Sequence, residues 1–201
     1  YDDAFVECEN VEYVSFTKYL KEMNYAFYQM PNMKYVYYKG TSEDWIKFKP
    51  QDNLMSQIQN IYFVDENGDP YTIEKINIPE GITEIYDHQF CNFKDLKEIV
   101  LPESLEKFGD YCFYNNDNLN KIYINSKIIA KNFENNKYYL KINNNAFLYI
   151  RSDITDLSSY IQTNYKKDFY PSFLYLVYPI HSRYISEYFH RQAFVLNMAQ
   201  T

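Results

Sequence analysis

The sequence predicts a repeat solenoid of short parallel strands stacked on one face, with irregular, short helical or 3-10 segments on the other. Two observations lead to this fold. The apolar pattern of residues 96–113 recurs with a period of 22 or 23 residues, since Phe5 lies 22 residues before Phe27 and Phe90 lies 23 residues before Phe113. Within each copy, apolar residues recur at every second position, as in a strand with one buried face.

The strand of each copy is clearest in residues 96–101. Ile99 and Leu101 face one way there, while Glu98 and Val100 face the other. Pro102 follows this strand and Pro79 follows the strand of the preceding copy. Proline has no N–H group to donate to a sheet, so it ends both strands at equivalent places. We expect one continuous core from the inward pairs Val14/Phe16, Val36/Tyr38, Ile76/Ile78, Ile99/Leu101 and Ile122/Ile124.

The second half of each copy adds two inward residues, such as Leu105 and Phe108, before a small residue and the recurrent phenylalanine. An aromatic residue that recurs once per copy indicates a step of the core and not a cofactor site. Cys8 and Cys112 also fall at core positions, where a free thiol behaves as a small apolar group. Three cysteines without a Cys-x-x-Cys pair suggest neither a disulfide framework nor a zinc site.

The segments "INIPEGITEIYDHQF" and "IVLPESLEKFGDYCFYNNDNL" resemble the BspA-like leucine-rich repeat, whose units read approximately I-P-x-x-V-x-x-I-x-x-x-A-F-x-x-C-x-x-L. Cys8 occupies the Cys position of that pattern, and Met30, Phe93 and Asn116 replace it in other copies. The segment "YVYYKGTSEDWIKF" resembles a Gly-Thr-x-x-x-Trp loop of such arrays. The resemblance covers about residues 1–125, so we expect the leucine-rich-repeat type of solenoid there, of α/β or mainly β class.

Residues 39–72 interrupt the period, because the separation of Phe27 from Phe90 is not a simple run of such units. Within them, residues 65–70 carry an Asn-Gly turn signal between apolar runs. We therefore expect an irregular, hairpin-like insertion that packs on the solenoid together with Trp45.

The same turn has the first three ligand spacings of a calcium loop, at Asp65, Asn67 and Asp69. Pro70 and Ile76 stand where that loop needs glycine and glutamate, so we interpret the segment as a plain turn.

After Asn125 the pattern degrades, and residues 126–201 are expected to form a degenerate last repeat and an irregular C-terminal cap over the exposed end of the core. Aromatic residues in segment 182–195 have spacings compatible with one face of a helix. That segment lacks the basic polar face of membrane-surface helices, which favours packing on the core.

The composition excludes several classes of function. A net charge of −7 argues against sequence-independent nucleic-acid binding. The apolar run 173–180 is far shorter than the ~20 residues of a membrane-spanning helix, so no membrane insertion is expected. His88, His181 and His190 have no metal-ligand spacing, and the 4 glycines form no phosphate-binding loop. We expect no catalytic, cofactor-binding or metal-binding residues, and no enzyme.

The outward positions of the strands form the candidate binding surface. Tyrosine suits an interface because it buries a large area with few rotatable bonds and keeps a polar tip. The chain also has 24 tyrosines, so tyrosines at these positions can equally reflect composition. One row of the surface contains Tyr13, Tyr35, Lys75, Glu98 and Lys121, and the other contains Ser15, Tyr37, Asn77, Val100 and Tyr123.

The resemblance implies a non-enzymatic interaction module, because BspA-like repeat proteins are commonly surface-associated and implicated in adhesion. The expected ligand is a protein or a surface glycan, and the expected location is extracellular or at the cell surface. Two alternatives remain open at this point: a structural spacer or stalk without its own ligand, and an intracellular scaffold.

Overall fold

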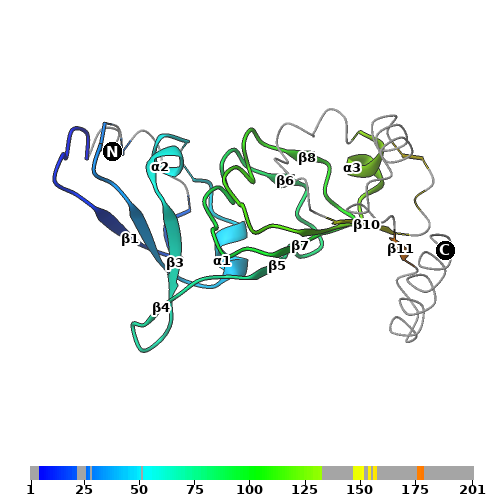
Figure 1. Cartoon of the computed structure of the whole chain (residues 1–201), viewed down its shortest axis with the longest axis horizontal. Helices are drawn as coiled ribbons and strands as arrows, with labels where there is room; N and C mark the ends of the chain where they lie inside the picture. Colours follow the sequence, from blue (N-terminus) through cyan, green and yellow to red (C-terminus); the bar gives the residue numbers. More distant parts are fainter. Residues whose placement is uncertain are drawn as a thin grey trace, which may run out of the picture.

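The two larger sheets among the described residues consist of short strands and follow one another along the long axis of the computed structural model (Figure 1). The structure describes residues 5–21, 26–27, 29–50, 52–132, 147–151, 154, 156–157 and 176–178. The first sheet contains β1 Tyr13–Thr17, β2 Tyr35–Lys39, β3 Asn60–Val64 and β4 Pro70–Tyr71. β1, β2 and β3 are parallel neighbours, and β4 returns antiparallel to β3.

The second sheet is entirely parallel in the order β11-β10-β9-β7-β5. Its strands are β5 Lys75–Asn77, β7 Glu98–Leu101, β9 Lys121–Ile124, β10 Phe147–Arg151 and β11 Leu176–Tyr178. Ile76 pairs with Ile99, and Ile99 pairs with Ile122, so residues 23 positions apart are direct neighbours. This register confirms the predicted stacking of parallel strands.

The other half of each copy is short and varied, and it contains a pair of strands where the sequence predicts irregular, short helical or 3-10 segments. β6 Glu84–Ile85 and β8 Lys107–Phe108 form a two-stranded parallel sheet. The helices are α1 Ser42–Ile46, α2 Asp52–Gln57 and α3 Lys127–Lys131. Thr41 begins α1 with a capping box, because its side chain accepts from the Asp44 N–H while the Asp44 carboxylate accepts from the Thr41 N–H.

The recurrent phenylalanines stack in two pairs, and Phe27, Phe90 and Phe113 are buried in the core, whereas Phe5 of the first copy is 47% exposed. The rings of Phe90 and Phe113 are 5.5 Å apart and nearly parallel, and those of Phe5 and Phe27 are 5.1 Å apart with the same tilt of 8°. The expected core step at this position is therefore confirmed.

The residue two positions after each of these phenylalanines adopts a left-handed backbone, with φ of 58° at Glu7, 53° at Gln29, 64° at Asn92 and 63° at Asn115. Such values are uncommon outside glycine, although asparagine tolerates them. The recurrence of one bend in four copies is independent evidence that the copies are equivalent.

Ion pairs link neighbouring copies across the surface. Each pair joins residues 22 or 23 positions apart, and each is individually weak because both side chains remain at least partly exposed. The pairs are Glu12–Lys34, Glu74–Lys97, Lys75–Glu98, Glu84–Lys107, Lys94–Asp117 and Glu98–Lys121. Opposite charges at equivalent positions favour this register over a slipped one.

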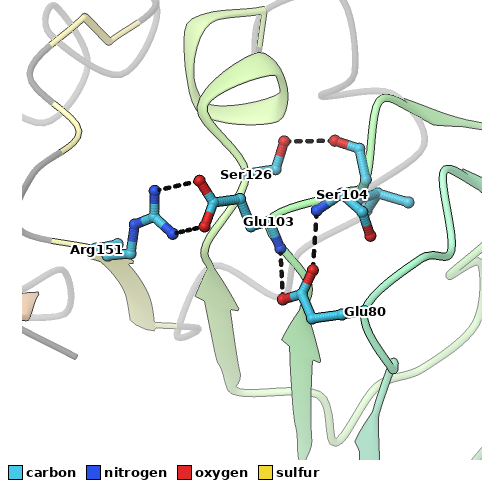
Figure 2. A network of polar contacts seen from close by, with 6 residues as sticks. Glu80, Glu103, Ser104, Ser126 and Arg151 are labelled. Carbon is cyan, nitrogen blue, oxygen red and sulfur yellow. Dashed lines mark hydrogen bonds and ion pairs between the residues drawn. The ribbon is translucent and has the colours of Figure 1, made fainter. Parts of the chain in front are cut away.

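Glutamates hold the corners that follow the strands of the second sheet (Figure 2). The Glu80 carboxylate accepts hydrogen bonds from the backbone N–H groups of Glu103 and Ser104, at 3.0 and 3.2 Å, in the next copy. The Glu103 carboxylate receives the Arg151 guanidinium of β10, with Nη2 at 2.9 Å from Oε1, in the two-bond geometry that makes such pairs strong. Each corner is thus bound by a later part of the chain.

A buried glutamine joins the two sheets. Gln89 is 1% exposed, and its amide nitrogen lies 3.2, 2.6 and 3.1 Å from the carbonyl oxygens of Trp45, Ile46 and Phe48. In return, the Trp45 indole N–H donates to the Gln89 carbonyl at 2.7 Å. Trp45 therefore packs on the repeats as predicted, and α1 lies between the sheets (Figure 1).

Residues 60–64 differ from the expected insertion. The hairpin is present, since the Asp65 side chain accepts from the N–H groups of Asn67 and Asp69 and turns the chain from β3 to β4. Yet β3 is also the third parallel strand of the first sheet, where Ile61 pairs with Val36. Val36 and Ile61 are further apart in the sequence than one regular period, because α2 precedes β3. The spacing of apolar residues therefore did not identify β3 as a strand of the repeat.

Residues 147–151 also differ from the expected irregular cap. As β10 they pair in parallel with β9, so that Leu148 follows Ile122 in the core, and β11 pairs with β10 in turn. The predicted helix at 182–195 lies outside the described residues.

Candidate binding surface

Four tyrosines form the outer face of the first sheet. Because side chains alternate along a strand, Val36 and Tyr38 point into the core while Tyr35 and Tyr37 point outward from β2. Register then brings Tyr13 beside Tyr35, and Tyr62 beside Tyr37. We call Tyr13, Tyr35, Tyr37 and Tyr62 the tyrosine face.

The rings of the tyrosine face touch one another. Tyr37 and Tyr62 are stacked with centroids 5.4 Å apart, while Tyr13 meets Tyr37 edge-on at 5.6 Å and Tyr35 meets Tyr62 at 5.9 Å. Tyr13 is 62% exposed, and the other three rings are half-buried by their neighbours. The face is thus a continuous aromatic surface held in shape by ring contacts, which such rings favour in stacked and edge-on geometry.

The outer face of the second sheet is charged at one end of its strands and aromatic at the other. The Glu98 carboxylate lies between the ammonium groups of Lys75 and Lys121 and is paired with both. One row further along the strands, Tyr123 stacks on Tyr149 with centroids 4.5 Å apart and planes within 16°. Burial, together with the nearby Glu98 charge, raises the pKa of Tyr149.

The predicted surface residues therefore divide between two sheets. Tyr13, Tyr35 and Tyr37 lie together on the first, while Lys75, Asn77, Glu98, Val100, Lys121 and Tyr123 lie together on the second. No strand pairing joins the two groups among the described strands, because β3 pairs with β4 and β5 pairs with β7. The single pair of rows expected from the sequence is interrupted at this point.

Two tyrosines beside the predicted rows were missed in the sequence, namely Tyr62, which is half-buried on the tyrosine face, and Tyr149, which is buried beside Tyr123. Both stand on strands that the spacing assigned to the insertion or the cap, β3 and β10. The signal that could have found them is local: each lies between two apolar residues of a strand-like run, as Tyr37 and Tyr123 do.

The buried cysteines offer no reactive group. Burial raises the pKa of Cys91 to about 12 and that of Cys112 well above its ordinary value, so both thiols stay protonated. Among the described residues, no group of three or more His, Cys, Asp or Glu side chains is placed to hold a metal ion. No helix in the described ranges has the length and apolar character to cross a bilayer.

Comparison with known proteins supplies one match. The model of the BspA-type leucine-rich repeat region, found in six copies, matches residues 1–65 and 56–164. No curated protein and no solved structure matches the chain. The matched residues contain the stacked phenylalanines and all strands from β1 to β10. The chain therefore belongs to the BspA-type leucine-rich repeat family.

Proposed function

We propose that this chain is a non-enzymatic interaction module of a secreted or cell-surface protein, which binds a protein or a surface glycan through its outer sheet faces. Repeats of this family generally mediate protein–protein or adhesive contacts, and proteins that carry them are typically binding proteins found at the cell surface. The extracellular location of this chain and its ligand class are part of the proposal.

The proposal includes the organisation of the chain. Residues 1–125 are a leucine-rich-repeat solenoid, and residues 126–201 complete it as a last repeat and a cap. The buried junction at Gln89 supports one body, because it joins backbone carbonyls of the first part directly to the second. A single body presents both outer faces to one large ligand.

The tyrosine face is the observation that carries the function. Interfaces concentrate their binding energy in a few aromatic side chains near the centre, and four contacting rings on a rigid sheet supply such a cluster. A rigid strand framework also loses little conformational entropy when it binds.

The test compares two sets of tyrosines in the full chain. Tyr13→Ser/Tyr37→Ser/Tyr62→Ser removes three of the four rings of the tyrosine face, whereas Tyr71→Ser/Tyr111→Ser/Tyr114→Ser removes three exposed rings elsewhere. Immobilised proteins are challenged with cell-surface extracts, and the retained ligand is then titrated. We expect the first variant to bind at least about 30-fold more weakly, as for the loss of one ~2 kcal/mol hot spot, and the second to bind normally. Equal binding by both variants, with unchanged melting temperatures, would contradict binding through the tyrosine face, and a native chain that retains no ligand would indicate a spacer instead.

A further inference from the structure

Five exposed lysines gather at the end of the first sheet. Backbone hydrogen bonds hold their segments side by side, since the Lys18 N–H donates to the Lys39 carbonyl at 3.0 Å and the Lys49 N–H donates to the Lys21 carbonyl at 2.9 Å. Lys47 caps the C-terminal end of α1, within the same turn. We call Lys18, Lys21, Lys39, Lys47 and Lys49 the lysine rim, and all five are exposed.

The lysine rim differs from seven other described lysines in its lack of ion pairs. Lys34, Lys75, Lys94, Lys97, Lys107, Lys121 and Lys131 each pair with a carboxylate. Within the described ranges, none of the five rim ammonium groups lies within 4.0 Å of a carboxylate. Among the described residues, a group of lysines without ion pairs is thus gathered in one place, although the chain has a net charge of −7.

Few acidic groups oppose this charge nearby. Glu43 and Asp44 are the acidic residues of α1, and the Asp44 carboxylate already accepts hydrogen bonds at 3.0 Å from the backbone N–H and the hydroxyl of Thr41. The Thr41 hydrogen bond lowers the pKa of Asp44, and the nearby Lys18 and Lys47 charges lower it further, so this helix cap also offsets part of the charge of the rim. Five lysines beside this carboxylate still leave an excess of positive charge that an external anion can neutralise.

Aromatic rings accompany the lysines. The Lys18 ammonium lies 5.8 Å from the ring centroid of Tyr19, which is 79% exposed, and the Lys49 ammonium lies 5.6 Å from that of Tyr86. Lys39 follows Tyr35 and Tyr37 on the outward side of β2, so the rim adjoins the tyrosine face. Lysine ammonium groups and tyrosine rings therefore lie together at this end of the sheet.

We propose that the lysine rim binds an anionic polysaccharide that carries sulfate or carboxylate groups. Lysine ammonium groups on flexible stems suit a flexible chain of separate anionic groups, and the tyrosine rings offer faces to the C–H groups of sugars. A long, stiff duplex is disfavoured, because beyond the rim it would meet the acidic remainder of the chain. This second surface goes beyond the function proposed above and stands even if the tyrosine face binds nothing.

The test uses heparin as the sulfated polysaccharide and uncharged dextran as its control, with the full chain at 50 and 200 mM NaCl. Salt weakens polyanion binding by about a factor of 3 per contacting lysine over this range. Five contacts predict a loss of roughly 100- to 500-fold for the native chain, and the two contacts left in Lys18→Gln/Lys39→Gln/Lys49→Gln predict roughly 10-fold.

The matched control is Lys94→Gln/Lys97→Gln/Lys107→Gln, which changes the net charge equally but alters only paired lysines. We expect it to bind heparin as the native chain does, while the rim variant binds at least 10-fold more weakly at 50 mM NaCl. Equal weakening by both variants, or no heparin binding at 50 mM NaCl, would overturn the proposal. Tighter binding to a DNA duplex or to phosphatidylserine vesicles than to heparin would overturn the assigned partner class.

Discussion

Gln89 provides the sharpest test of how the two sheets are joined. Other copies have a small residue here, such as Ala26 or Cys112, directly before the recurrent phenylalanine. Gln89→Ala therefore restores the ordinary residue of the repeat, and Gln89→Leu keeps the volume without the amide. If Gln89 were only a step of the repeat core, both variants would be nearly neutral.

The expected cost follows from the groups that lose a partner. The Ile46 and Phe48 carbonyls lose their donor, and the Tyr86 N–H loses the Gln89 Oε1 acceptor at 2.9 Å. The Trp45 carbonyl keeps the Phe48 N–H at 3.0 Å. At about 1 kcal/mol for each of three buried groups, Gln89→Leu lowers the free energy of unfolding by about 3 kcal/mol. For a chain of this length that is a fall of roughly 6–12 °C in melting temperature.

Thermal melts followed by circular dichroism measure this effect in the full chain. Cys112→Ala is the matched control, because it removes one buried sulfur at the equivalent position of the next copy and costs about 1 kcal/mol. A melting temperature for Gln89→Leu within 2 °C of the native value, with Cys112→Ala behaving as expected, would refute the junction.

Three further predictions concern stability. Gly109→Ala should lower the free energy of unfolding, measured in urea, by more than Gly81→Ala does. A Cβ at Gly109 would lie 2.2 Å from the Asp87 backbone nitrogen. At Gly81 there is open space, and only its φ of +92° opposes alanine, at a cost of about 1–2 kcal/mol. Glu103→Gln should lower the free energy of unfolding by about 1.5–3 kcal/mol, because it replaces the carboxylate that accepts from the buried Arg151 guanidinium by a neutral amide. A cost no larger than that of exposed Glu106→Gln would contradict this. Burial raises the pKa of Cys91 to about 12 and that of Cys112 well above its ordinary value of 9.0. Above pH 9 the thiols therefore ionise in the unfolded chain only, and the free energy of unfolding should fall by about 1.4 kcal/mol per pH unit for each buried thiol. An equally steep fall in Cys91→Ala/Cys112→Ala would contradict this origin.

The period of the repeat was predictable from sequence because it depends on spacing alone. Ile76, Ile99 and Ile122 are equally spaced, and a regular parallel register brings equally spaced residues together. Spacing did not predict β3 and β10 as strands of the repeat. Val36 and Ile61 pair across more than one regular period, and so do Ile122 and Leu148. Register tolerates such changes when a loop or helix takes up the extra residues.

The junction and the lysine rim could not be predicted in the same way. Both depend on which turns become neighbours after stacking: Gln89 meets carbonyls more than 40 positions earlier, and Lys49 meets Lys21. In the sequence, the five lysines are spread over residues 18–49 and form no visible cluster. The net charge of −7 therefore gave no indication of a local basic surface.

Equivalent positions of the repeat show where the chain satisfies its own charges and where it leaves them for a partner. Counted from the inward residues Phe16, Ile78 and Leu101, the corner position two residues later is held by Lys18, Glu80 and Glu103. Both glutamates are bound within the chain, by backbone N–H groups and by Arg151. Lys18 has the opposite charge and no ion pair among the described residues. In the first sheet the third strand also has an acidic corner, since Asp65 follows Phe63 by two residues and accepts from the N–H groups of Asn67 and Asp69. The reversal of charge is therefore confined to β1, where a repeat that only needed to stack would gain from an acidic residue too, and a ligand explains Lys18 better than stability does.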